Sequence, residues 1–258
     1  MNKTALITGA SSGIGFELAI AFAAQHENLI LIARSEAKLE EMAKDISSKF
    51  SVKVNTFVID LSEINSAQKV FDFCQENNLH VDYLVNNAGF GDFGLFAQSN
   101  WGKQVQMINL NITTLTHLTH LFLPSMIKNK FGKIMNVSST AAFQPGPTMS
   151  VYYATKAFVL HFSEAIANEL EGSGVTVTAL CPGATESGFQ SAAAMEESKL
   201  VKGKKLPSSA EVAAYGYKAM MEGKKVAIHG IMNYLMANAV RFSPRNMVLK
   251  MVRMIQDK

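Results

Sequence analysis

A serine, a tyrosine and a lysine lie close together in the stretch STAAFQPGPTMSVYYATK at residues 139–156. Tyr152 precedes Lys156 by four residues, so a helix places the phenol and the ammonium on the same face. A free tyrosine has a pKa of about 10, and a neighbouring ammonium favours the phenolate and lowers that pKa towards the working range. We therefore expect proton transfer here, although Tyr153 also lies within one helical turn of Lys156.

The N-terminal residues have the pattern of a strand, a glycine-rich turn and a helix. An apolar run at 4–8 is followed by GASSGIG at 9–15 and then by an alanine-rich helical pattern. Glycines permit a tight turn, and N–H groups at a helix N-terminus bind a pyrophosphate with the help of the helix dipole. The spacing differs from Gly-x-Gly-x-x-Gly, so the cluster taken alone also fits a plain tight turn. Its candidate cofactor contacts are Gly9, Ser11, Ser12, Gly13, Ile14 and Gly15.

Composition restricts the class of protein. The 258 residues are 48% hydrophobic and 17% charged, which is typical of a soluble globular protein. No linker or repeat divides the chain, so we expect one domain over 1–230 and a C-terminal extension over 231–258. A net charge of +3 gives no basic field for nucleic acid. Cys74 and Cys181 suit a reducing compartment, and no leader or membrane-spanning run is recognised, so we expect a cytoplasmic protein.

Apolar, β-branched runs alternate with longer helical patterns along the chain. After the run at 4–8, such runs occur at 29–33, 54–59, 81–86, 133–138, 175–180 and 225–229. Continuously apolar strands that alternate with helices indicate a parallel sheet covered on both faces. We therefore predict an α/β fold, a Rossmann-type doubly wound parallel sheet of about seven strands. Ligands of such sheets bind beyond the carboxyl ends of the strands.

The residue after the second run bears on the choice of cofactor. Arg34 stands where an NAD site would have an acid for the ribose 2′-hydroxyl. A guanidinium suits a 2′-phosphate, so NADP(H) is favoured over NAD(H). Alternatively, Arg34 is a solvated residue at the start of a helix, and the nearby Glu36 weakens the positive field.

Further candidates follow the third and fourth runs. Asp60 and Leu61 are candidate adenine contacts, or Asp60 caps a helix that starts near Ser62. The turn NNAG at 86–89 combines amides with small residues and permits close approach of a cofactor, or it is a plain turn. Its candidate cofactor contacts are Asn87, Ala88 and Gly89.

Taken in order, these motifs resemble those of the short-chain dehydrogenase/reductase family. The resemblance covers residue 3 to about 229 and rests on TGASSGIG at 8–15, Asp60, NNAG at 86–89, Asn111, Ser139, YYATK at 152–156 and CPGATES at 181–187. It implies a Rossmann-fold oxidoreductase that uses a nicotinamide cofactor. The family's serine lies thirteen positions before its tyrosine, which selects Ser139 over Ser138 and Tyr152 over Tyr153.

The resemblance also implies a role for each catalytic candidate. Tyr152 would contact the cofactor and exchange a proton with the substrate oxygen, and Ser139 would hydrogen-bond to the same oxygen. Lys156 would tune Tyr152 and bind the nicotinamide ribose. Asn111 would hold a water molecule that connects the lysine to solvent, with Asn109 as its competitor for this role.

The segment after the sixth run is expected to cover the nicotinamide. By the same resemblance, Pro182 and Gly183 form the turn beneath the nicotinamide, and Thr185 contacts its carboxamide. Ser187 is a second candidate for that contact, although the family often has threonine at this position. Residues 188–206 look like a mobile lid rather than a rigid wall.

The expected substrate site is apolar. Its candidate residues are Phe90, Phe93, Phe143, Met149 and Phe189. They favour a small lipophilic ketone, aldehyde or 3-oxoacyl compound, or the corresponding alcohol. His117 and His120 share a helix face, but no cysteine or carboxylate cluster accompanies them, so packing is favoured over a metal site.

The extension over 231–258 is basic and amphipathic. Ser243-Pro244 can start a helix whose apolar stripe lies opposite three basic residues, Arg245, Lys250 and Arg253. Such a helix contacts an anionic membrane or a partner protein, or it packs on its own domain or at a dimer interface, which is the commoner case. We expect a homodimer or homotetramer, and the family resemblance suggests helices around 103–127 and 152–171 as its interface.

Two classes of function remain. The first is an NADP(H)-dependent oxidoreductase that interconverts a carbonyl group and an alcohol. The second is a non-catalytic NADP-binding sensor or scaffold, which would need Gly13 and Arg34 but not Tyr152 beside Lys156. Because the whole proton-transfer set is present, the enzyme is favoured.

Overall fold

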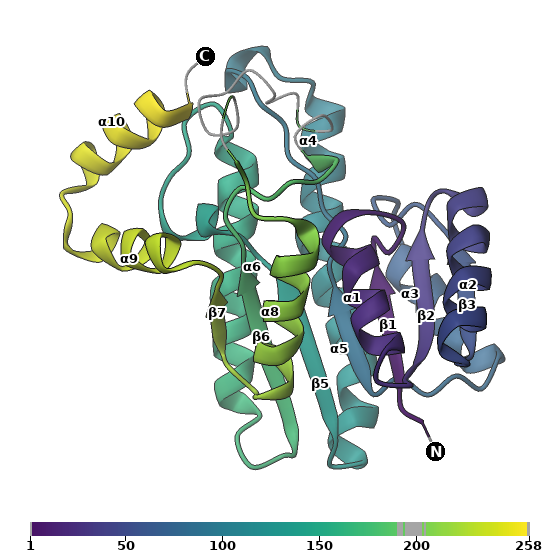
Figure 1. Ribbon diagram of the computed structural model, residues 1–258. Helices are drawn as coiled ribbons and strands as arrows, with labels where there is room; N and C mark the ends of the chain where they lie inside the picture. Colours follow the sequence, from purple (N-terminus) through teal and green to yellow (C-terminus); the bar gives the residue numbers. More distant parts are fainter. Residues whose placement is uncertain (1, 190–192, 194–202, 204, 257–258) are drawn as a thin grey trace.

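The computed structural model describes residues 2–189, 193, 203 and 205–256, which form one seven-stranded sheet with helices around it (Figure 1). Neighbouring strands pair in parallel, in the order β3-β2-β1-β4-β5-β6-β7. The strands are β1 (Thr4–Thr8), β2 (Asn28–Ala33), β3 (Val54–Val58), β4 (Tyr83–Asn86), β5 (Gly132–Val137), β6 (Val175–Cys181) and β7 (Val226–Ile228). The prediction of a doubly wound parallel sheet is confirmed.

Helices cover both faces of the sheet, as strands that are apolar on both sides require. One core contains Ile7 and Leu31 and is covered by α1 (Gly13–Ala23), α2 (Glu36–Phe50) and α8 (Ser209–Met221). The opposite core contains Leu6 and Ile30 and is covered by α3 (Ser66–Glu76), α5 (Leu115–Lys128) and α6 (Ser150–Glu169). Adjacent residues of one strand thus enter opposite cores, because side chains alternate along a strand.

The strand order reverses at β1, which pairs with β2 on one side and with β4 on the other. The connections that leave β1 and β4 therefore diverge and open a crevice beyond the carboxyl ends of these strands. The glycine-rich turn at 9–15 follows β1, and the loop at 87–89 follows β4. This reversal brings the two segments into contact, although they are distant in sequence.

One long helical segment is interrupted where it passes the crevice. After the short helix η1 (Phe96–Gln98), α4 (Trp101–Ile108) continues through the π-helical turn η2 (Asn109–Thr114) into α5. π-helical turns are rare and occur frequently at functional sites. The side chain of Asn111 in this turn is buried.

The C-terminal residues form α9 (Ile231–Ala239), the short helix η4 (Val240–Phe242) and α10 (Arg245–Gln256). These helices, yellow in Figure 1, lie to one side of the sheet beyond β7. As expected, α10 begins directly after Ser243-Pro244, and it buries Val248 and Val252 in a cluster with Tyr152 and Tyr153. One face of α10 therefore packs on the chain's own domain.

Two further expectations concern the lid and the absence of a membrane-spanning segment. Most of the expected lid at 188–206 lies outside the described residues. Within the described ranges, no helix combines the length and the apolar character that a membrane span requires.

Candidate active site

A cavity of about 1670 Å³ lies beyond the carboxyl ends of the strands and contains most of the predicted site residues. Four predicted residues do not line this cavity: Gly15, Phe93, Asn111 and Phe143. The predicted residues that line it are Gly9, Ser11, Ser12, Gly13, Ile14, Arg34, Asp60, Leu61, Asn87, Ala88, Gly89, Phe90, Ser139, Met149, Tyr152, Lys156, Pro182, Gly183, Thr185, Ser187 and Phe189.

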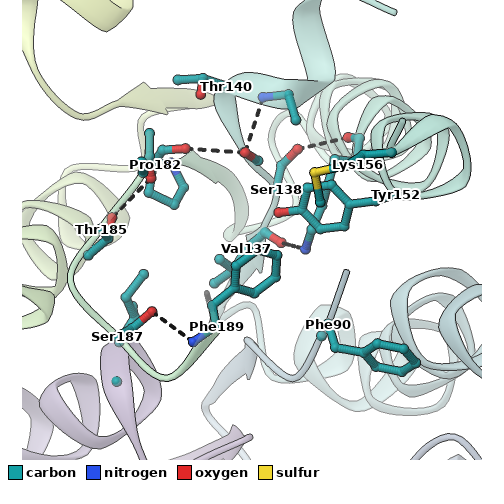
Figure 2. Close-up of a pocket in the computed structure, with 18 of the residues that line it drawn as sticks. Phe90, Val137, Ser138, Thr140, Tyr152, Lys156, Pro182, Thr185, Ser187 and Phe189 are labelled. Carbon is teal, nitrogen blue, oxygen red and sulfur yellow. Dashed lines mark hydrogen bonds between the residues drawn. The ribbon is translucent and has the colours of Figure 1, made fainter. Parts of the chain in front are cut away.

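Tyr152 and Lys156 lie on successive turns of α6, and their side chains lie next to each other in the cavity (Figure 2). The Lys156 Nζ atom lies 5.8 Å from the centre of the Tyr152 ring. It also donates a hydrogen bond of 2.8 Å to the carbonyl oxygen of Val137 at the end of β5. The ring of Phe189 packs on that of Tyr152, with 5.3 Å between the ring centres. The phenol and the ammonium are thus held together in a mostly apolar surrounding.

The two neighbouring serines after β5 have different contacts. The Ser138 hydroxyl donates a hydrogen bond of 2.8 Å to the carbonyl oxygen of Lys156 and so fastens α6 to β5. The Ser139 hydroxyl interacts with the Tyr152 phenol. It also accepts a hydrogen bond from the Ala141 N–H group and donates one of 3.3 Å to the Pro182 carbonyl oxygen. Ser139 is therefore the serine whose hydroxyl lies next to the phenol.

Burial governs the titration of Tyr152 and Lys156. It raises the pKa of Tyr152 well above the ordinary value, and the hydrogen bond with Ser139 offsets only part of this rise. The expectation that the pKa of Tyr152 is lowered towards neutrality is wrong for the protein chain by itself, because loss of solvent disfavours the phenolate more than its neighbours stabilise it. Burial also lowers the pKa of Lys156, to about 8. The phenol is therefore protonated at neutral pH, as a proton donor must be.

Lys156 should make stability depend on pH in a defined window. Between pH 8 and its ordinary pKa of 10.5, unfolded Lys156 carries a proton that folded Lys156 has lost, so the free energy of unfolding rises with pH. Relative to the Lys156→Met variant, we expect the free energy of unfolding of the wild type to rise by on the order of 3 kcal/mol across this window. Urea unfolding of both proteins at several pH values measures the difference. If the free energies of unfolding of the two proteins depended on pH in the same way, Lys156 could not lose its proton in this window in the folded protein.

Asn111 does not line the cavity but hydrogen-bonds to two segments that do, the loop at Phe90 and helix α6. Its side-chain amide group donates hydrogen bonds of 3.0 Å to the carbonyl oxygen of Phe90 and to the hydroxyl of Thr155. Its amide oxygen accepts a hydrogen bond from the Phe90 N–H group. A Cβ atom on Gly89 would lie 3.0 Å from this oxygen and 3.4 Å from the Lys156 Nζ atom. Asn111 thus lies close to Lys156, and its role in a proton relay stays a prediction.

The glycine-rich turn is fixed by the loop after β4. The side-chain amide of Asn87 donates hydrogen bonds to the carbonyl oxygens of Thr8 and Gly9. A Cβ atom on Gly15 would lie 2.4 Å from both the Asn87 amide nitrogen and the Gly9 carbonyl oxygen. A glycine is therefore needed at position 15 because the residues behind the turn pack closely there. At position 13 a glycine suits the backbone, which has a φ of +57°. Asn87 positions the turn in addition to lining the cavity.

Arg34 lies at the rim of the cavity, with its guanidinium 3.7 Å from the Asp60 carboxylate and its side chain 79% exposed. Partial burial acts to raise the pKa of Asp60, but the hydrogen bonds from Ser62 and the charge of Arg34 outweigh it and lower the pKa. Asp60 caps the turn at Ser62, and α3 starts only at Ser66, later than expected. Lys38 on α2 also lines the cavity, so a second cation accompanies Arg34 at this end.

Three of the five predicted substrate residues line the cavity, namely Phe90, Met149 and Phe189. Phe93 packs in the cluster behind them. Phe143 packs elsewhere, against a cluster that contains Leu160 and Cys181, because the short helix η3 (Thr140–Phe143) directs it there.

Sequence reasoning missed the contribution of the C-terminal helices to this cavity. The apolar periodicity of residues 247–255 was the available signal, but its partner surface could not be identified from it. The large apolar side chains that line the cavity from this part of the chain are Met232, Met236, Val240, Val248, Met251, Val252 and Ile255.

The sheet topology and this site define the class of protein. Residues 3–198 match the short chain dehydrogenase family, and the protein belongs to it. Among solved structures, a short-chain dehydrogenase from Sphingobium yanoikuyae in complex with NADPH superposes with a TM-score of 0.82 at 30% identity. That alignment covers 93% of this chain and 94% of the other. The fold is therefore shared over nearly the whole chain.

Two curated relatives carry the names of particular enzymes. A very-long-chain 3-oxoacyl-CoA reductase of Phaeosphaeria nodorum is 37% identical over 182 residues, which are 67% of this chain and 52% of that protein. Sulfoacetaldehyde reductase 2 of Chromohalobacter salexigens is 39% identical over 194 residues, 73% of this chain and 75% of that protein. The aligned part thus spans between about half and three quarters of the length of these relatives.

Proposed function

We propose that the protein is an NADP(H)-dependent oxidoreductase that interconverts a small lipophilic carbonyl compound and its alcohol. The observation that carries this proposal is the joint position of Ser139, Tyr152 and Lys156 in the cavity that begins at the glycine-rich turn. A sensor or scaffold needs only the nucleotide site, so the proton-transfer set favours an enzyme. Both curated relatives bear the names of reductases of carbonyl compounds, which supports the same reaction class.

The residues around the turn fit a dinucleotide. Ser12, the N-cap residue of α1, makes no side-chain hydrogen bond to the helix, so N–H groups of the first turn remain for an anion. Gly9, Ser11 and Gly13 line the cavity at this point. Bound NADP(H) would supply or accept the hydride at the other end of the cavity. There Lys156 is proposed to bind the nicotinamide ribose, and Thr185 is proposed to bind the carboxamide group of the nicotinamide.

The proposed chemistry in the reductive direction is a hydride transfer coupled to a proton transfer. The carbonyl carbon gains the hydride, and Tyr152 donates its phenolic proton to the oxygen as negative charge develops there. The Ser139 hydroxyl donates to the same oxygen in place of the Pro182 carbonyl oxygen that it contacts now. Lys156 then returns a proton to the phenolate, which its reduced pKa facilitates. Atoms balance, since one hydride and one proton convert the carbonyl to an alcohol.

The preference for NADP(H) is proposed to rest on Arg34. Replacing Arg34 by methionine should weaken NADPH binding by roughly tenfold to hundredfold, because a hydrogen bond to a charged group contributes about 1.5–3 kcal/mol. NADH lacks the 2′-phosphate, so its affinity should stay nearly unchanged. Fluorescence titration of both nucleotides measures this, with Lys44→Met on α2 as a control for loss of one positive charge. Equal losses for NADPH and NADH would refute the role of Arg34.

The function itself is tested with a panel of carbonyl compounds. Purified protein is incubated with NADPH or NADH and with aliphatic, aromatic, steroidal and 3-oxoacyl carbonyls, and oxidation of the nucleotide is followed. The apolar side chains of Phe90, Met149 and Phe189 favour lipophilic members of the panel. Tight binding of NADPH without turnover of any compound would instead support the sensor or scaffold.

The assembly and the location are also proposals. A homodimer through the helices around 103–127 (α4 and α5) and 152–171 (α6) is supported by the exposed Phe158 on α6, whose ring stacks on that of Phe162. Cross-linking that finds only monomer would refute it. The free, buried thiols of Cys74 and Cys181 are compatible with the reducing cytoplasm.

A further inference from the structure

The C-terminal helices carry a large share of the exposed apolar side chains. Of the 17 large apolar residues that are exposed in the described part of the chain, ten lie between residues 231 and 254. Some of them, such as Met236 and Met251, line the cavity. Seven others do not line it, and they form what we call the outer apolar set: Ile231, Tyr234, Leu235, Phe242, Met247, Leu249 and Met254.

The outer apolar set is too exposed to serve the packing of its own domain. The side chain of Phe242, between the two helices, is 90% exposed, and Ile231 and Met254 are 75% and 65% exposed. The packing of α10 is instead made by Val248 and Val252 on its other face. In Figure 1, α9 and α10 lie at the side of the molecule, beyond the last strand of the sheet. This part of the chain is therefore accessible to a large partner.

Basic residues accompany the outer apolar set, and acidic residues are absent from the same stretch. The sequence has no aspartate or glutamate from residue 223 to residue 256. Arg241, Arg245 and Lys250 are exposed, and none of them forms an ion pair with a carboxylate among the described residues. The positive charge of this surface is thus not neutralised by the protein itself, and an anionic surface complements it.

We propose that α9, η4 and α10 bind peripherally to an anionic lipid surface, with the outer apolar set inserted between headgroups. Amphipathic helices with basic residues beside large apolar ones bind membrane interfaces in this way. A second copy of the chain is a poorer occupant, because a twofold contact places the same basic surface on itself. This inference does not depend on the proposed reaction, although the same helices line the cavity and bring it next to the bilayer.

Sedimentation with vesicles tests the inference on the full chain. Phosphatidylcholine vesicles that contain phosphatidylserine should bring the protein into the pellet, and pure phosphatidylcholine vesicles should do so much less. Each basic residue near an anionic surface contributes about fivefold to binding. Arg245→Glu combined with Lys250→Glu should therefore weaken binding at least about 25-fold. The matched control is Lys44→Glu with Lys69→Glu on α2 and α3, which should bind like the wild type.

The apolar contribution is tested separately. Phe242→Ser combined with Met254→Ser should weaken vesicle binding by roughly tenfold or more, since each side chain loses apolar burial. Ile64→Ser, at a residue that is 78% exposed elsewhere, should have no effect. Failure of the wild type to sediment with either vesicle would overturn the inference. So would size-exclusion data in which Phe242→Ser converts a dimer to a monomer, because a second copy would then cover this surface.

Discussion

Replacing Tyr152 by phenylalanine should lower carbonyl reduction by about 10²–10⁴-fold, the usual contribution of a positioned proton donor. The phenyl ring keeps the packing against Phe189 and the place in α6, so only the hydroxyl is lost. The measurement is kcat/KM with the best compound of the carbonyl panel. NADPH affinity, measured in parallel, should change little, because no contact to the nucleotide turn is removed.

Tyr153 provides a matched control for this substitution. It lies on the same helix, and both tyrosines are 8% exposed. Its hydroxyl accepts a hydrogen bond from the side chain of Gln256, so Tyr153→Phe should loosen α10 rather than remove the proton donor. Full activity of Tyr152→Phe would show that Tyr152 is not the proton donor. A greater loss of activity in Tyr153→Phe than in Tyr152→Phe would show the same.

Gly15→Ala should damage nucleotide binding and stability together. The new Cβ atom would lie 2.4 Å from the carbonyl oxygen of Gly9, which is backbone and cannot rotate away. Such overpacking costs about 1–3 kcal/mol of the free energy of unfolding. The shift of the turn should also remove at least one hydrogen bond to the pyrophosphate and weaken NADPH binding by about tenfold to hundredfold. Thermal unfolding and fluorescence titration measure the two effects.

A second glycine serves as the control for this substitution. A Cβ atom on Gly188 would meet nothing within 4 Å, so Gly188→Ala should unfold at nearly the same temperature as the wild type. Equal stability and equal NADPH affinity of Gly15→Ala and the wild type would show that the turn is not as tightly packed as described.

Local sequence patterns were sufficient for the fold and for much of the site. Strands that are apolar on both faces indicated a covered parallel sheet, and the topology of such a sheet gathers the ends of its strands. For this reason Gly13 and Asn87 could be assigned to one crevice before any distance was known. The choice of Ser139 and Tyr152 over their neighbours Ser138 and Tyr153 came from the family resemblance, not from the strand pattern.

Features that depend on burial or on distant contacts could not be predicted in the same way. The spacing of Tyr152 and Lys156 shows that they share a helix face, but it does not show that both are buried, which reverses the expected pKa shift of the phenol. The position of Phe143 depends on the short helix after Ser139, for which the sequence has no clear signal. The contact of Val248 and Val252 with α6 joins segments about a hundred residues apart.

The central claim is that Tyr152 and a bound nicotinamide nucleotide reduce a carbonyl group in this cavity. The most direct test incubates the protein with NADPH deuterated at the transferable nicotinamide position and the best carbonyl compound, and analyses the product by mass spectrometry. We expect an alcohol that carries the deuterium on its former carbonyl carbon, formed by the wild type and almost absent with Tyr152→Phe. Product without deuterium, or equal labelling by both proteins, would contradict the account.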